Sequence, residues 1–88
     1  MSSRLFSLEG RTAVITGGLG QLGRQFTAAM VESGARVAIL DTRPGPPSTD
    51  CCLYLEADVT DRSSLESAAA RVDAAFGPPH VLVHATGP

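Results

Sequence analysis

Residues 16–23 read Thr16-Gly17-Gly18-Leu19-Gly20-Gln21-Leu22-Gly23, a stretch in which half of the positions are glycine. Glycines permit a tight turn, and they let the backbone come close to a bound anion because no Cβ stands in the way. A helix that begins just after such a turn offers unpaired N–H groups and a partial positive charge. The stretch therefore predicts a turn that binds phosphate groups.

The segments on either side of this turn have the patterns of a strand and a helix. Residues 12–16 are mostly apolar and rich in β-branched side chains, which is typical of a strand buried on both faces of a parallel sheet. Apolar side chains recur at helical spacing after the turn, which predicts a helix that ends near Ser33. Its apolar face is expected to consist of Leu22, Phe26, Ala29 and Met30.

The rest of the chain continues the alternation. Residues 36–40 have the pattern of a second strand that ends at Asp41, and residues 53–56 have that of a third. Three prolines exclude a regular helix from the connection over residues 42–50. A clean amphipathic pattern then predicts a helix over residues 61–76. Two N-terminal caps compete for this helix, Thr60 or a capping box of Ser63 and Glu66, and a fourth strand follows at Val81-Leu82-Val83-His84.

This order of elements predicts an α/β fold with a parallel sheet and right-handed crossovers. We expect four strands in the spatial order 3-2-1-4 with two main helices, which is a partial Rossmann fold. Residues 1–88 are expected to form a single partial dinucleotide-binding domain, truncated after the fourth strand. The fourth strand would be a bare edge, so we expect a further C-terminal segment or a second copy in a homo-oligomer to cover it.

Asp41 follows the second strand and stands eighteen residues after Gly23. A carboxylate at that position can accept hydrogen bonds from the 2′- and 3′-hydroxyls of an adenosine ribose, and it would repel a 2′-phosphate. Asp41 therefore favours NAD over NADP as the cofactor. Arg43 and Arg24 point the other way, because a guanidinium could pair with that phosphate, although we interpret both as solvated surface cations. A purely structural glycine turn is the remaining alternative.

Several other functions are excluded or disfavoured by composition. The chain contains no lysine, so it cannot form a P-loop of the kind that hydrolyses ATP or GTP. A net charge of −2 without a basic stripe argues against nucleic acid as a partner. No apolar run approaches the roughly 20 residues of a membrane-spanning helix, which predicts no membrane association and a cytoplasmic location. His80 and His84 lack ligand-type neighbours, so we expect no metal site.

These motifs resemble those of the short-chain dehydrogenases/reductases over nearly the whole chain. Residues 16–23 resemble the family's cofactor motif and Asp41 its NAD-selecting acid, while Asp58-Val59 resembles the pair that contacts the adenine ring. Gln21 stands where the common form of the motif has glycine, and His84 stands at the first position of the usual Asn-Asn-Ala-Gly. The resemblance implies cofactor contacts at Gly17, Gly20, Gln21, Leu22, Gly23, Asp41, Asp58 and Val59.

The resemblance also implies hydride transfer between NAD and an alcohol or carbonyl, which the family performs with a Tyr-x-x-x-Lys pair. Tyr54 is the only tyrosine, Asp58 stands four residues later, and the chain has neither lysine nor asparagine. We therefore assign no catalytic residue and expect an inactive N-terminal cofactor-binding portion of such an oxidoreductase. The alternatives are a non-catalytic dinucleotide-binding sensor or interaction module, and an unstable remnant without a function.

Overall fold

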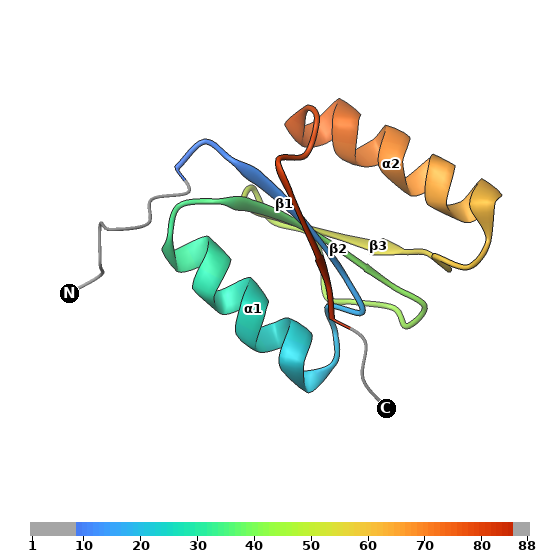
Figure 1. The fold of residues 1–88 in the computed structure, drawn as a ribbon, viewed down its shortest axis with the longest axis horizontal. Coiled ribbons are helices and arrows are strands. Elements are labelled where there is room, and N and C mark those ends of the chain that lie inside the picture. Colours follow the sequence, from blue (N-terminus) through green and yellow to red (C-terminus); the bar gives the residue numbers. More distant parts are fainter. Residues whose placement is uncertain (1–8, 86–88) are drawn as a thin grey trace.

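The structure is a computed structural model that describes residues 9–85. Strands and helices alternate along this part of the chain, as the sequence patterns predict (Figure 1). The elements are β1 (Thr12–Thr16), α1 (Gln21–Glu32), β2 (Arg36–Asp41), β3 (Cys52–Glu56), α2 (Arg62–Phe76) and β4 (Val81–His84). The strand β3 begins one residue earlier than expected, and α2 begins one residue later.

The four strands form one parallel sheet in the order β3-β2-β1-β4, which confirms the predicted topology. The register places Val14 of β1 opposite Ala38 of β2 on one side and Leu82 of β4 on the other. All five residues of β1 are buried, because this strand is central and both of its faces are covered. The C-terminal ends of β1, β2 and β4 meet at one edge of the sheet.

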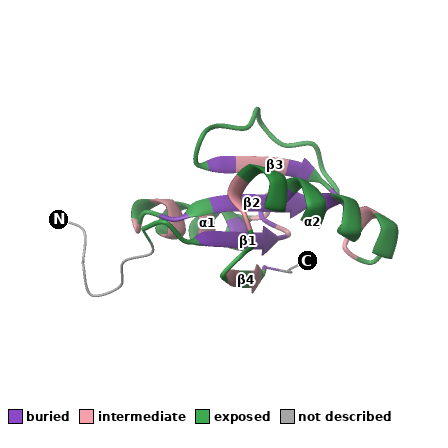
Figure 2. Cartoon of the chain, turned by 90° about the horizontal axis from the view of Figure 1, so that it is seen from above, coloured by how far each residue is buried: buried purple, intermediate pink, exposed green. Residues whose placement is uncertain are grey.

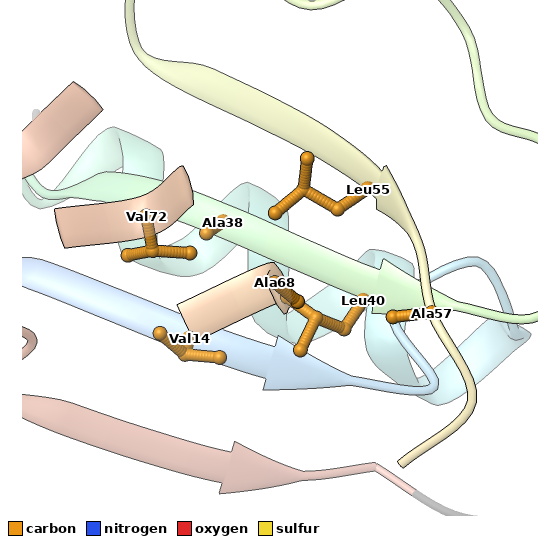
Figure 3. Close-up of a cluster of buried hydrophobic side chains, with 7 residues drawn as sticks. All are labelled: Val14, Ala38, Leu40, Leu55, Ala57, Ala68 and Val72. Carbon is orange, nitrogen blue, oxygen red and sulfur yellow. The ribbon is translucent and has the colours of Figure 1, made fainter. Parts of the chain in front are cut away.

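The helices cover opposite faces of the sheet, so the fold has three layers (Figure 1). Two helical residues, Ala68 and Val72, are buried against the sheet on the α2 face, and β1, β2 and β3 all contribute to the cluster beneath them (Figure 3). This cluster consists of Val14, Ala38, Leu40, Leu55, Ala57, Ala68 and Val72. The opposite cluster centres on Ile15, Val37 and Ile39, which are almost completely buried under α1.

The expected packing face of α1 is only partly correct. Leu22 is 50% exposed and Phe26 37% exposed, although both were expected to face the sheet. The one buried residue of the helix is Gly23, and Met30 and Val31 pack on the core beside it. A glycine at this contact lets α1 approach the sheet closely, so the helix packs through a small residue and turns much of its apolar face outward.

The expected caps of α2 are wrong. Asp61 is the N-cap, and its side chain accepts a hydrogen bond of 3.0 Å from the Ser63 backbone N–H. Thr60 instead bonds to the Asp58 carboxylate through both its N–H and its hydroxyl. The carboxylate of Asp58 thus competes for the Thr60 side chain, and Asp61 is left to satisfy the helix terminus.

The edge strand β4 is the least covered part of the sheet. Within residues 9–85 it pairs only with β1, and its residues alternate between partly buried and exposed (Figure 2). Leu82 is 71% exposed on the same side of the sheet as α2. Both helices of the described residues are too short to cross a membrane. The same residues hold no group of three potential metal ligands.

Candidate functional site

The turn between β1 and α1 is shaped by backbone hydrogen bonds. Gly17 has φ of +70°, a left-handed conformation that favours glycine, and its N–H donates to the Leu40 carbonyl at 2.7 Å. The Gly20 N–H then donates to the Gly17 carbonyl at 3.2 Å, and Gly20 becomes the N-cap of α1. Gly20 has no side chain to cap the helix, so the first turn of α1 presents its N–H groups without a side-chain partner from the N-cap.

Two glycines of this turn have different surroundings. A Cβ on Gly23 would lie 2.5 Å from the Cα of Gly18 and 2.6 Å from the Gly17 carbonyl oxygen, so the protein itself requires a glycine there. A Cβ on Gly20 would meet no atom closer than 3.5 Å, and the φ of Gly20 is −73°, which any residue adopts. The fold alone therefore gives no steric reason for Gly20.

Asp41 ends β2 beside this turn, and its carboxylate is buried and accepts four hydrogen bonds. Its Oδ2 accepts from the Leu19 N–H and from Arg43 Nη2, both at 3.1 Å. Its Oδ1 accepts from the Arg43 N–H at 3.0 Å and from Arg43 Nε at 3.1 Å. The Arg43 side chain, above all, lowers the pKa of Asp41 from 3.8 to about 2, against the opposing effect of burial. Arg43 is therefore the ion-pair partner of Asp41, and its side chain remains 60% exposed on the surface as expected.

A cavity of about 750 Å³ opens between the glycine turn and the end of β2. It lies where β1, β2 and β4 end, which is where open α/β sheets bind their ligands. Six of the residues expected to contact a cofactor line it: Gly17, Gly20, Gln21, Leu22, Gly23 and Asp41. It is also lined by Gln25, Thr42, Arg43 and Ala85, which were not among the expected contacts. Thr42 directly follows β2 and Ala85 directly follows β4, and this position after a strand is a sequence signal that could have identified both.

The other two expected contacts lie apart from this cavity. Asp58 lines a second hollow of about 280 Å³ together with Glu56 and Ser64, and Thr42 belongs to both hollows. The Thr60 hydroxyl and N–H bond to the Asp58 carboxylate and lower its pKa. The Val59 side chain packs on the hydrophobic cluster beneath α2. The structure therefore brings six of the eight expected residues together around one cavity. Asp58 lies in the neighbouring hollow, which shares Thr42 with that cavity, and Val59 lines neither hollow.

His84 bonds to the residue that precedes the glycine turn. Its Nδ1 and the Thr16 hydroxyl form a short hydrogen bond across the β1–β4 pair. The bond joins the C-terminal ends of two strands beside the cavity, so His84 holds β1 and β4 together there. Thr86 and Gly87, which complete the motif that begins at His84, lie outside the described residues.

Tyr54 does not reach the large cavity. It lies in β3 and lines a separate hollow of about 290 Å³ between α1 and the proline-rich loop. Its contact with Cys52, together with burial, raises the pKa of Tyr54 to about 12. Tyr54 therefore lies apart from the glycine turn and Asp41, which line the large cavity.

Comparisons with known proteins agree with this geometry. The sorbitol dehydrogenase of Cereibacter sphaeroides is 37% identical over an alignment of 87 positions, which covers 88% of this chain and 32% of that protein. The 3-ketoacyl-(acyl-carrier-protein) reductase of Brucella melitensis, solved with NADH, has a TM-score of 0.78 at 27% identity, over 86% of this chain and 34% of its own. The N-domain of a bacterial malonyl-CoA reductase, solved with NADP, has a TM-score of 0.82 at 26% identity, over 92% of this chain and 17% of its own.

The chain thus spans 32% of the length of the sorbitol dehydrogenase and 31% of that of an uncharacterized oxidoreductase of Schizosaccharomyces pombe, which is 35% identical. The family profile described as short chain dehydrogenase matches residues 11–88, which include the glycine turn, Asp41 and all four strands. This chain therefore belongs to the short-chain dehydrogenase family.

Proposed function

We propose that this chain binds the adenosine and pyrophosphate part of NAD, as the cofactor-binding portion of a short-chain dehydrogenase. The observation that carries the proposal is the cavity of about 750 Å³, which is lined by the glycine turn on one side and by Asp41 on the other. Its volume lies within the range of small-molecule sites. The pyrophosphate would lie at the N-terminus of α1, where N–H groups and the helix dipole favour an anion.

The glycine at position 20 supports this proposal. A Cβ on Gly20 would not clash with the protein, so the fold does not require a glycine at this position. A glycine there instead leaves room for a bound group that approaches the backbone from the cavity. In dinucleotide-binding turns, a glycine at this kind of position allows the pyrophosphate to come close. Asp41 would bind the adenosine ribose, and Asp58 with the Val59 N–H would bind the adenine ring beyond Thr42.

NAD supplies a nicotinamide that accepts or donates a hydride. The 88 residues contain no lysine, and Tyr54 lies outside the cavity, so we propose that this chain holds the cofactor without transferring the hydride. The whole protein's reaction, by analogy with its family, would oxidise an alcohol or reduce a carbonyl. Residues 1–88 would form its partial dinucleotide-binding domain.

A pair of glycine variants tests the cofactor site. Calorimetric titration of the chain with NAD and with adenosine diphosphate ribose should show binding, and Gly20→Ala should weaken it on the order of 10-fold by keeping the pyrophosphate from the backbone. The thermal unfolding of Gly20→Ala should remain cooperative and near that of the unaltered chain, because the added Cβ meets no close atom.

The control variant is Ser67→Ala, an equally small change on the exposed side of α2, which should leave binding unchanged. Gly23→Ala should instead lose the folded state, because its Cβ would collide with the backbone of Gly17 and Gly18. Equal NAD affinity for Gly20→Ala and the unaltered chain would remove the pyrophosphate from this turn.

A second candidate function is a non-catalytic module that binds a dinucleotide and docks on a partner. The edge of β4 favours it, because within residues 9–85 this strand pairs on one side only, with β1, and Leu82 lies largely in solvent, which is a surface on which another chain can pair. A second copy of this chain or a further segment of the same protein would cover the edge. The two functions share the cofactor site and differ in what β4 contacts, so the state of association separates them.

A further inference from the structure

The carboxylate proposed to bind the ribose is already saturated with hydrogen bonds. A carboxylate has about four acceptor positions, two on each oxygen. In Asp41, Oδ1 accepts from the N–H and Nε of Arg43, and Oδ2 accepts from the N–H of Leu19 and Nη2 of Arg43. No acceptor position is left for the two hydroxyls of a ribose.

The four donors differ in how easily they can leave. Two are backbone N–H groups, held in place by the glycine turn and by the end of β2. The other two belong to the guanidinium of Arg43, whose side chain is 60% exposed. An exposed ion pair of this kind is weak and can be exchanged. Release of the guanidinium would free one acceptor position on each oxygen, which matches the 2′- and 3′-hydroxyls of a ribose in number.

The guanidinium also lies in the space that the ribose would need. Arg43 lines the same cavity as the glycine turn, and its Nη2 lies 3.7 Å from the position of a Cβ on Gly20. A ribose that contacts Asp41 while its pyrophosphate lies on the turn would pass between these two groups. The guanidinium and the ribose therefore cannot occupy the carboxylate together.

We propose that Arg43 is an internal competitor of the adenosine ribose, which must displace the guanidinium from Asp41 before NAD is bound. This inference rests on the proposed NAD site. The displaced guanidinium stays beside the ribose, where NADP carries its 2′-phosphate, and pairs with that phosphate. Arg43 thus weakens the binding of NAD and strengthens that of NADP. It therefore reduces the preference for NAD over NADP that Asp41 produces.

The substitution Arg43→Met tests the competition, because it keeps a long side chain and removes both donors and the charge. NAD and adenosine diphosphate ribose should bind about 2- to 5-fold more tightly, since the ribose no longer displaces an ion pair. NADP should bind on the order of 10-fold more weakly, since its phosphate loses a charged partner. Isothermal calorimetry of both cofactors on both proteins measures these changes, and thermal unfolding checks that the variant is folded.

Two controls separate competition from general electrostatics. Arg24→Met removes the same charge from a residue that lines the separate hollow beside Tyr54, so its effects on NAD and NADP should have the same sign. Adenosine and 2′,3′-dideoxyadenosine carry no phosphate, and only adenosine offers the two hydroxyls. Arg43→Met should tighten the binding of adenosine more than that of the dideoxy compound, which has no hydroxyls to replace the guanidinium on Asp41.

The outcomes distinguish this inference from the proposed function. If NAD binds the unaltered chain and Arg43→Met leaves its affinity unchanged or lower, Arg43 is no competitor and the NAD site still stands. If Arg43→Met changes the affinities for NAD and NADP in the same direction, as Arg24→Met is expected to do, the effect is only one of net charge and the inference fails. If no nucleotide binds either protein, the proposed function fails as well.

Discussion

At the scale of single residues, Asp41 has two roles that a sequence motif does not separate. Its carboxylate faces the cavity, and it also anchors the glycine turn through the Leu19 N–H. Its spacing after Gly23 predicted the place of the carboxylate. The hydrogen bonds that saturate it could not be predicted, because they depend on the rotamer of Arg43 and on the exact approach of the turn.

The ionised form of Asp41 should stabilise the fold. The pKa of Asp41 is about 2 in the folded protein and ordinarily 3.8, so the contribution is present above about pH 4 and is lost as the pH falls toward 2. It should amount to about 1–2 kcal/mol, allowing for the exposure of Arg43. Denaturant unfolding of the unaltered chain and of Asp41→Asn should show a difference in the free energy of unfolding that shrinks over this range. A difference that grows as the pH falls would contradict the assignment.

At the scale of elements, the strands were predictable because each buried strand carries its own local signal. Residues 12–16 are mostly apolar and residues 37–40 are wholly apolar, and both runs are buried as expected. The packing of α1 was not predictable from hydrophobicity, because the helix approaches the sheet through Gly23, and a contact between backbones leaves no apolar pattern. The N-cap of α2 was also misassigned, because Thr60 and Asp61 are both good caps and the choice depends on Asp58.

The N-cap of α2 gives a prediction for this element. Asp61→Ala should lower the free energy of unfolding by about 1 kcal/mol, because the Ser63 N–H loses its acceptor and the helix dipole loses a favourable charge. Ser63→Ala is the matched control and should be nearly neutral, since the Ser63 backbone makes the capping bond. Equilibrium unfolding in urea compares the two variants. A larger loss for Ser63→Ala than for Asp61→Ala would restore the capping box.

At the scale of the whole molecule, β4 is the part of the sheet that the described residues leave least buried. The two helices cover opposite faces of the sheet (Figure 1), and Leu82 of the edge strand β4 is 71% exposed. The topology was predictable, because right-handed crossovers and alternating elements admit few arrangements. What covers the free edge of β4 was not predictable, because the sequence of one strand does not specify what pairs with it.

The exposed edge should make the chain associate at high concentration. Leu82→Lys should reduce this association, because a charge on an edge strand disfavours pairing with another strand. Ala74→Lys adds the same charge on an exposed position of α2 and should leave association unchanged. Sedimentation velocity over a range of concentrations measures the effect. A chain that stays monomeric throughout would argue against pairing of two copies through β4.

The hydrogen bond from the Leu19 N–H to Asp41 bears on how cofactor preference could evolve in this chain. Replacement of Asp41 by alanine or serine would remove the charge that repels a 2′-phosphate. It would also remove the hydrogen bond from the Leu19 N–H to the end of β2, and leave the bond from the Gly17 N–H to the Leu40 carbonyl. Such a substitution would change the preference between NAD and NADP and would also loosen the turn that is proposed to bind the pyrophosphate. Substitution of Arg43 leaves the anchor intact, so natural variation at position 43 is the less disruptive route by which the preference for one dinucleotide could drift.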